Sequence, residues 1–223
     1  MLQHVFERVS LSRYLSSIII ATDDDGVYRE AKKFGANVRM TRAGHPSGTD
    51  RVAEVASSES ADIIVNIQGD EPLIDPAAID AAILPLLDDP ATPMGTLKKQ
   101  IQNPAEIADP NVVKVVTDLA DNALYFSRSP IPHVRQAGGV RPMHYYKHIG
   151  LYVYRRDFLL GYSDLPMGPL EQAERLEQLR ALENGHPIRV VETEYESVGV
   201  DTPADLEKIT KLMEASALGV HNG

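Results

Sequence analysis

The sequence contains no cysteine, and this absence excludes several kinds of chemistry. Disulfide bonds, zinc sites built from thiolates and thiol nucleophiles all require cysteine, so this chain can have none of them. The composition is compatible with a reducing compartment, and we expect a cytoplasmic protein.

Long apolar runs and clusters of basic residues are also missing. No apolar stretch approaches the roughly 18 residues that a membrane-spanning helix needs. Residues 1–4 do not begin the basic-then-apolar pattern of a signal peptide. The formal net charge is −10, which argues against nucleic acids and anionic membranes as partners. A phosphate-bearing substrate held by a few arginines and a metal ion is still compatible with this charge.

The common catalytic signatures are absent as well. The sequence has no Gly-x-Ser-x-Gly, no His-Glu-x-x-His and no Gly-x-Gly-x-x-Gly, so the usual hydrolase, zinc-protease and dinucleotide-binding readings lack support. A length of 223 residues with 43% hydrophobic residues suits one α/β domain with at most a small subdomain.

The central feature of the chain is a strand followed by an acidic loop and a helix. Residues 63–67 are apolar and rich in β-branched side chains, which is typical of a buried strand. Gln68-Gly69-Asp70-Glu71-Pro72 ends this strand, because glycine permits a tight bend and proline cannot continue a β-ladder. Asp75 and Pro76 then begin a helix that extends to residue 87. Ligands of open α/β sheets bind at the carboxyl ends of strands, where this loop falls.

Two interpretations of this acidic loop remain open. The oxygens of Gln68, Asp70 and Glu71 suit a hydrated Mg²⁺ ion that also binds phosphate. Alternatively, the loop simply keeps its charges in water.

Strands and helices alternate along much of the chain. Further strands are expected at residues 17–21, 37–40, 94–98, 112–117, 123–126, 145–154 and 188–192. This pattern predicts an α/β fold of the Rossmann-like type, with a mostly parallel central sheet and a small mixed β subdomain.

Two further segments carry candidate ligand-binding residues. The loop 41–50 is rich in glycine and hydroxyl groups, and it offers backbone N–H groups and Arg42 to a nucleotide, although it lacks the glycine–lysine pattern of a Walker loop. In the aromatic strand 145–154, His148 and Tyr152 share one face. They line a sugar pocket, or the tyrosine hydroxyls simply reach water.

Near the C-terminus, a helix is expected from Pro169 to about Gly185. Glu171 and Gln172 lie in its first turn, where a carboxylate either complements the helix dipole or binds substrate hydroxyls. Asp201 stands just outside a helix cap at residues 202–203 that does not need it, which makes Asp201 a metal candidate.

Taken in order, these segments resemble the 3-deoxy-manno-octulosonate cytidylyltransferases, also called CMP-Kdo synthetases. The resemblance covers nearly the whole chain and favours this family over the related sialic-acid cytidylyltransferases. The matching segments are Ala21-Thr22-Asp23, Met40-Thr41-Arg42-Ala43, Ser47-Gly48-Thr49 and the residues 65–72, 111–116, 123–128, 147–152, 169–171, 176–180 and 199–203.

The resemblance implies a reaction in which CTP and the sugar acid Kdo give CMP-Kdo and pyrophosphate, for lipopolysaccharide synthesis. It implies Mg²⁺ as cofactor, with Asp70 and Asp201 as the catalytic and metal-binding residues. It also implies a homodimer and a single domain over residues 1–223, in which 123–165 serve sugar binding and dimerisation. The implied nucleotide-binding residues are Arg42, Ser47, Gly48, Thr49 and Gln68, and the implied sugar-binding residues are Arg128, His148, Tyr152, Glu171 and Gln172.

One departure from the family pattern affects the expected activity. Family members begin with a further strand and a loop of the type Pro-Ala-Arg-x-x-Ser-x-Arg-Leu-Pro-Gly-Lys, which binds the triphosphate. In this sequence no lysine or arginine precedes Arg8. We therefore expect little or no turnover from the chain as written when it is assayed with CTP, Kdo and Mg²⁺.

Two alternatives to this assignment are retained. The chain could activate another sugar acid, such as sialic acid, with CTP. It could also be a non-catalytic remnant that only binds a ligand or pairs with a complete subunit.

Overall fold

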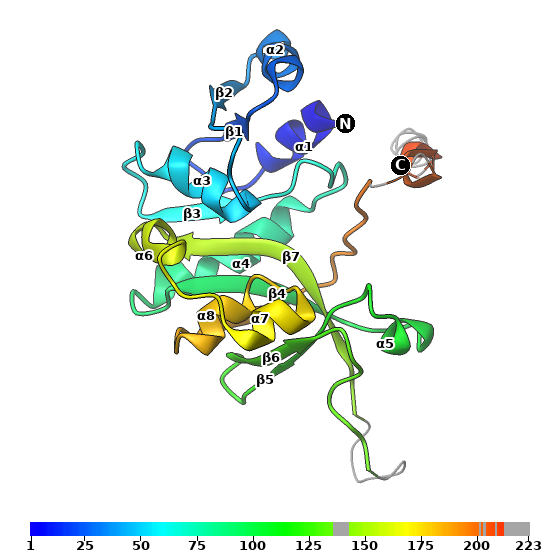
Figure 1. The fold of residues 1–223 in the computed structure, drawn as a ribbon. Helices are drawn as coiled ribbons and strands as arrows, with labels where there is room; N and C mark the ends of the chain where they lie inside the picture. Colours follow the sequence, from blue (N-terminus) through cyan, green and yellow to red (C-terminus); the bar gives the residue numbers. More distant parts are fainter. Residues whose placement is uncertain (136–142, 201, 203, 208, 212–223) are drawn as a thin grey trace.

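The computed structural model describes residues 1–135, 143–200, 202, 204–207 and 209–211, in which helices pack on both sides of a β-sheet (Figure 1). The helices are α1 (Leu2–Val9), α2 (Asp25–Lys33), α3 (Gly48–Ala56), α4 (Pro76–Asp88), α5 (Ala105–Ala108), α6 (Arg156–Tyr162), α7 (Pro169–Glu174) and α8 (Leu179–Glu183). The strands are β1 (Ile19–Thr22), β2 (Asn37–Met40), β3 (Ile63–Asn66), β4 (Met94–Gln100), β5 (Lys114–Thr117), β6 (Ala123–Ser127), β7 (Tyr146–Arg155) and β8 (Ile188–Glu192).

Six strands form the larger sheet, and the ten-residue strand β7 lies at its centre. β4 pairs antiparallel with it along nearly its whole length, β3 pairs antiparallel with its C-terminal half, and β5 pairs with its N-terminal end. β5 and β6 form the hairpin expected from residues 112–126, and β8 pairs parallel with β4. The expected small β subdomain is thus the β5–β6 end of a continuous sheet.

The predicted α/β class is confirmed, while the strand pairing differs from the mostly parallel arrangement that we expected. β3 and β4 run in the same direction, but β7 lies between them and runs the opposite way. In this sheet only the pair β4–β8 is parallel among the described strands. The alternation of strands and helices predicts the direction of β3 and β4, but it gives no sign that a later strand inserts between them.

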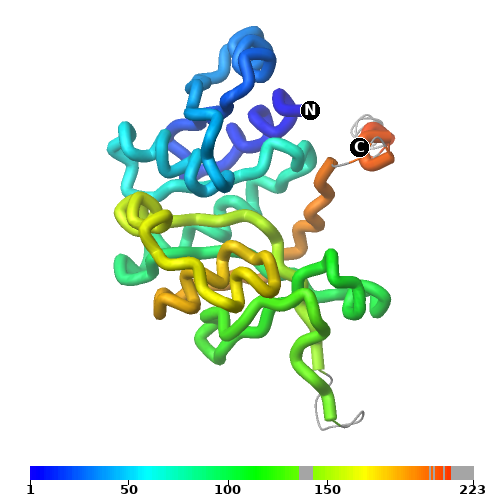
Figure 2. The backbone as a smooth tube through the Cα atoms, viewed as in Figure 1, coloured from blue at the N-terminus to red at the C-terminus, as the bar shows by residue number. Residues whose placement is uncertain are grey.

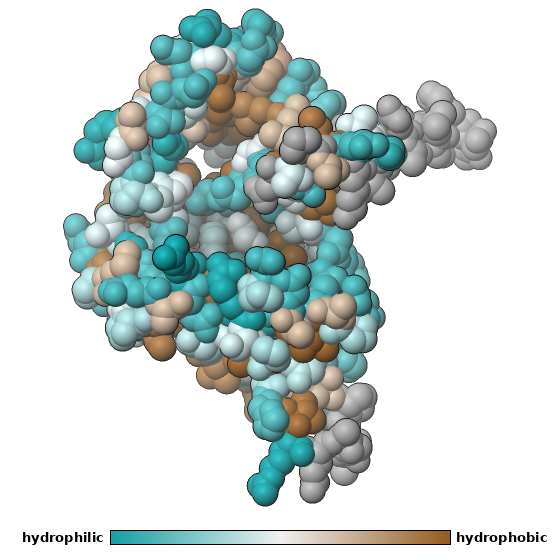
Figure 3. Space-filling view, turned by 45° about the vertical axis from the view of Figure 1, so that its right-hand side comes forward, coloured by the Kyte–Doolittle hydropathy of each residue, from teal (hydrophilic) through white to brown (hydrophobic). Residues whose placement is uncertain are grey.

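β1 and β2 form a separate two-stranded parallel sheet. It lies in the upper part of the view, where the N-terminal part of the chain is coloured blue (Figure 2). A cavity of about 390 Å³ lies between this sheet and β3. Consecutive residues of both strands line it, namely 19–21 and 63–67. Because neighbouring side chains of a strand point to opposite faces, a lining by consecutive residues means that the strand edges face the cavity. Figure 3 shows hydrophobic residues around this hollow.

Two apolar clusters cover the two faces of the larger sheet. On one face, α4 packs Ile79, Ile83 and Leu86 against the sheet residues Leu97 and Leu151. On the other face, α6 and α8 contribute Leu159 and Leu179, which pack with Phe126, Tyr154 and Ile188. This second face carries the tyrosines and the histidine of β7, so it is the face where a polar site can form.

The helix predicted from 169 to 185 is interrupted in the structure. α7 ends at Glu174, and Arg175 takes a left-handed conformation with φ of 52° before α8 begins at Leu179. Left-handed backbone is costly for a residue with a side chain, so the break is maintained by surrounding contacts. Helical periodicity did not reveal this break, and it also missed α6.

In the described part of the chain, every helix is too short or too polar to cross a membrane.

We predict that backbone amides of β1 and β2 exchange with solvent much faster than those of β4 and β7. An isolated two-stranded sheet is marginally stable, and this one is backed by a small cluster of Ala31, Ala36 and Val38. Hydrogen–deuterium exchange followed by mass spectrometry tests this, with α4 as the protected reference. Equal protection of β1 and β7 would contradict it.

Candidate active site

One face of β7 carries a row of rings in mutual contact. His148 lies 5.5 Å from Tyr152 and 5.0 Å from Phe126 between ring centroids, and Tyr152 lies 6.1 Å from Tyr154. The predicted shared face of His148 and Tyr152 is therefore confirmed. Nε2 of His148 is 2.9 Å from the hydroxyl of Thr96. This enclosure lowers the pKa of His148 to about 3 through desolvation, so the imidazole is neutral at physiological pH. Burial likewise raises the pKa of Tyr152.

The hydroxyl loop before α3 approaches this face. Ser47 is the N-cap of α3, where its Oγ accepts from the N–H of Asp50 at 3.2 Å. The same hydroxyl lies 3.1 Å from Oε1 of Glu177. Thr49 is buried and hydrogen-bonds to both Tyr154 and Glu177. Two of the predicted nucleotide-binding residues, Ser47 and Thr49, thus lie beside the predicted sugar-binding face.

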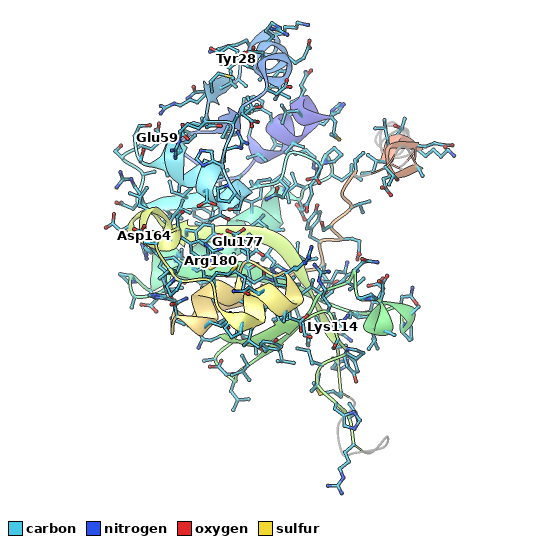
Figure 4. The ribbon with its side chains drawn as sticks, viewed as in Figure 1. Tyr28, Glu59, Lys114, Asp164, Glu177 and Arg180 are labelled. Atoms are coloured by element: carbon cyan, nitrogen blue, oxygen red, sulfur yellow. The ribbon has the colours of Figure 1, made fainter. Side chains whose placement is uncertain are left out.

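Glu177 stands where the hydroxyl loop, the aromatic face and α8 meet (Figure 4). Desolvation by burial raises the pKa of its carboxyl. The next residue, Gln178, is only 3% exposed, and its Nε2 has no hydrogen-bond partner among the described residues. A buried amide without a partner is rare, and either a water molecule or a ligand group can accept its hydrogen bond.

The break after α7 directs Glu177 to this position. Neither Glu177 nor Gln178 was predicted to have a role, because an unbroken helix from 169 to 185 offers no reason to single them out. The only available signal was the segment 176–180, which belonged to the family resemblance.

The two residues predicted in the first turn of α7 behave differently. The carboxylate of Glu171 is buried and paired with Arg180 through two hydrogen bonds of 2.9 and 2.7 Å. The hydrogen bonds to Glu171 raise the pKa of Arg180 further above its ordinary range. Gln172 is exposed on the helix surface. The structure therefore engages Glu171 in an internal ion pair and leaves Gln172 in solvent.

The two predicted arginines are engaged with protein groups. Arg128 donates from Nε to the carbonyl of Glu174 at 2.8 Å and from a terminal nitrogen to Pro110 at 2.9 Å. Arg42 is exposed and pairs with Glu54 at 3.3 Å. Neither guanidinium contacts the aromatic face in the described structure, although the exposed Arg42 can reorient at little cost.

The acidic loop begins at the end of β3 that points towards the His148 end of β7. In the antiparallel register Asn66 lies opposite Tyr152, so the chain beyond β3 continues towards the His148 end of β7. Gln68 is exposed and, like Gly48, lines the cavity between the sheets. The side chain of Asp70 forms no hydrogen bond or ion pair with the described residues, and it is half-buried.

The segment that follows β8 reaches this loop. The N–H of Val200 donates to the carbonyl of Asp70 at 3.0 Å, and a Cβ placed on Gly199 would lie 3.8 Å from Oδ2 of Asp70. The next residue in the chain is Asp201, which lies outside the described residues. Within the described ranges, no group of three or more metal-binding side chains occurs.

The sequence matches the cytidylyltransferase family over residues 1–192. The chain belongs to the cytidylyltransferase family. It is similar to a 3-deoxy-manno-octulosonate cytidylyltransferase of Solibacter usitatus (strain Ellin6076), with 70% identity over 100% of this chain and 88% of the relative. A protein with the same name from Geobacter sulfurreducens is 54% identical over 96% of this chain and 89% of its own length.

The fold of this cytidylyltransferase is also similar to that of a solved structure. A CMP:2-keto-3-deoxy-manno-octonic acid synthetase complexed with CTP superimposes with a TM-score of 0.91 at 46% identity, covering 96% of this chain and 88% of that one. The family resemblance inferred from the sequence segments is therefore confirmed.

We predict that Arg180→Met destabilises this cytidylyltransferase by about 3 kcal/mol, because it leaves the buried carboxylate of Glu171 without its partner. The double variant Arg180→Met with Glu171→Leu should recover most of that loss, since no charge is then buried alone. Urea denaturation of the two variants and the parent chain measures both effects. An unchanged midpoint for the single variant would contradict the prediction.

A second prediction concerns acid stability. The pKa of His148 is about 3 in the folded chain and about 6.5 when unfolded, so the unfolded state binds the additional proton as the pH falls. Folding stability should therefore decrease between pH 6.5 and pH 3, by up to about 2 kcal/mol at pH 5. Comparing urea denaturation of His148→Gln with the parent chain at pH 7 and pH 5 isolates this contribution. The same pH dependence in both proteins would refute the assignment.

Proposed function

We propose that this chain is a cytidylyltransferase that activates Kdo with CTP, giving CMP-Kdo and pyrophosphate. One observation carries the proposal: the hydroxyl loop at Ser47 and Thr49 meets the aromatic face of β7 at Glu177. A nucleotide on the loop and a sugar on the aromatic face would then be neighbours, as a transfer between them requires. The names of the similar proteins supply the two substrates.

In the proposed reaction, the anomeric 2-hydroxyl of Kdo attacks the α-phosphorus of CTP. A bond forms between that oxygen and phosphorus, the bond from the α-phosphorus to the oxygen that bridges to the β-phosphate breaks as pyrophosphate leaves, and the hydroxyl proton passes to solvent. The protein forms no covalent bond with either substrate in this reaction, so its residues act mainly by positioning both substrates and by excluding water.

We assign the sugar hydroxyls and carboxylate to His148, Tyr152, Glu177 and Gln178. The neutral imidazole and the tyrosine present hydrogen-bonding groups on an apolar face, which suits a sugar. The unpaired amide of Gln178 gives a further donor. Glu171 then contributes indirectly, because it fixes Arg180 under this site, while Gln172 and Arg128 would contact only parts of the sugar that extend beyond the face.

We place the nucleotide along Ser47, Gly48 and Thr49, with Arg42 and Gln68 at its edges. The N-terminus of α3 presents free backbone N–H groups beside these residues, and such a helix end favours phosphate. Arg42 is exposed and its pairing with Glu54 is a surface contact, so a triphosphate can compete for it.

Cytidylyltransferases act with a divalent metal ion, and we propose Mg²⁺ held by Asp70 and Asp201. The unpaired carboxylate of Asp70 fits an ion that prefers oxygen ligands. Val200, which directly precedes Asp201 in the sequence, donates its N–H to the carbonyl of Asp70 at 3.0 Å. When bound, Mg²⁺ would neutralise phosphate charge.

We also propose that residues 123–165 contribute a homodimer contact in addition to the sugar face. Three exposed apolar side chains in this range support such a contact, namely Leu124, Val134 and Met143. We place the dimer in the cytoplasm, where CTP is available.

Pyrophosphate release tests the proposal through its selectivity. At high protein concentration, release with CTP and Mg²⁺ is expected with Kdo and not with sialic acid, however slow it is, and Asp70→Asn should abolish it because the proposed metal ligand is lost. Thr202→Ala serves as the matched control beside Asp201. Equal release with both sugar acids, or an active Asp70→Asn variant, would contradict the assignment. Absence of release with either sugar, together with no calorimetric signal for CTP, would favour the non-catalytic alternative.

A further inference from the structure

Glu71 is a buried carboxylate to which the proposed reaction assigns no role. It is 8% exposed and follows Asp70 directly in the loop after β3. Both of its oxygens accept hydrogen bonds from one distant segment: Oε2 from the hydroxyl of Tyr195 at 3.0 Å and Oε1 from the hydroxyl of Ser197 at 2.7 Å. Burying a carboxylate costs several kcal/mol in desolvation unless such bonds offset it. The buried position of Glu71 therefore needs an explanation.

The segment bound by Glu71 is the part of the chain that leads from β8 to Asp201. Tyr195 and Ser197 are two positions apart, and side chains at that spacing in an extended chain point to the same side. Three residues further along, Val200 donates its N–H to the carbonyl of Asp70 at 3.0 Å. Adjacent residues of one loop thus hold the segment at positions 195, 197 and 200, while the carboxylate of Asp70 stays unpaired.

From this arrangement we infer that Glu71 is a positioning residue that fixes residues 195–200 against the loop of Asp70, a proposed metal ligand. The inference rests on the proposed metal pair, and it adds a residue that touches neither metal nor substrate. Asp70 supplies a proposed ligand, and its neighbour Glu71 anchors the backbone of residues 195–200 beside it.

The ion pairs of the same segment go to Lys99 of β4 and Lys147 of β7, not to the loop that contains Asp70. Lys99 binds the carbonyl of Glu194 at 2.6 Å and the carboxylate of Glu196 at 3.0 Å, but Glu196 is 49% exposed. Exposed ion pairs of flexible side chains constrain a backbone weakly. Among the described residues, the side-chain bonds of this segment that are directed at the loop containing Asp70 are those to Glu71, and the bond from Tyr195 is fully buried.

Mn²⁺ affinity, measured by water-proton relaxation on the whole chain, tests the inference without requiring turnover. Glu71→Ala should weaken Mn²⁺ binding about 10-fold, the effect expected when a partner outside the ligand shell is removed. Glu71→Gln should stay within about threefold of the parent, because its amide oxygen still accepts and the two hydroxyls can rotate. Ser197→Ala, which removes one of the two bonds, should give an intermediate affinity.

A matched control is available in Glu174, another partly buried carboxylate that accepts from a serine hydroxyl, here Ser127 at 2.6 Å. Glu174→Ala removes a comparable bond far from Asp70, and it should leave Mn²⁺ affinity unchanged. Thermal unfolding of each variant shows whether the loss of a bond acts on stability alone. If Glu71→Ala fails to fold, Ser197→Ala and Tyr195→Phe carry the same test from the other side of the contact.

The outcomes separate this inference from the proposed function. If Asp70→Asn binds Mn²⁺ as well as the parent chain, or the parent binds none, the proposed metal site fails and the role of Glu71 fails with it. If Asp70→Asn loses Mn²⁺ binding while Glu71→Ala lowers only the melting temperature, the proposed metal site is supported. The contacts of Glu71 then stabilise the fold only, and the inference about Glu71 fails. A selective loss of affinity in Glu71→Ala and Ser197→Ala, with Glu71→Gln and Glu174→Ala unaffected, confirms the inference.

Discussion

The pairing of β7 with β3, β4 and β5 is the constraint on which the rest of the site depends. This one strand connects the acidic loop, through β3, with the hairpin β5–β6 at the other end of the sheet. Its register sets Asn66 opposite Tyr152, and that match determines how far the acidic loop lies from the ring of His148. A shift of one residue would turn the histidine and the tyrosines to the face covered by α4. The position of Asp70 and the chemistry of the aromatic face are therefore set by the same ladder.

The interruption between α7 and α8 serves the site in a second way. In a continuous helix Glu171 and Glu177 would lie about 9 Å apart along the axis and about 120° apart around it. The left-handed residue Arg175 instead lets α7 present Glu171 to Arg180, while Glu177 turns to the hydroxyls of Ser47 and Thr49. The strained backbone at Arg175 thus allows the carboxylates of Glu171 and Glu177 to contact different partners.

Local sequence signals predicted much of this fold. The strands expected at 63–67 and 37–40, the Asp75–Pro76 helix start and the hairpin after residue 112 follow from β-branched runs, caps and turn residues. The structure contains all of them, with the first strand one residue shorter than expected. The shared face of His148 and Tyr152 followed from alternation alone.

The features that the sequence did not reveal are those that depend on distant partners. No local rule places β7 between β3 and β4, because strand order is decided by the whole sheet. The helix break at Arg175 is a tertiary override of strong helical periodicity. For the same reason Glu171 was predicted to be a site residue and Glu177 was not. The sequence shows two similar glutamates near helix starts, and only their distant partners differ: Glu171 pairs with Arg180, and Glu177 lies beside Ser47.

The hollow between β1 and β3 has a consequence for behaviour in solution. Within the described residues each of these strands pairs along one side only, so two rows of backbone amides and carbonyls face an apolar space. Unsatisfied edges of this kind are templates for intermolecular β-pairing, the first step of aggregation. A net charge of −10 keeps copies apart by mutual repulsion, so the colloidal stability of the protein rests on electrostatics that added salt will screen.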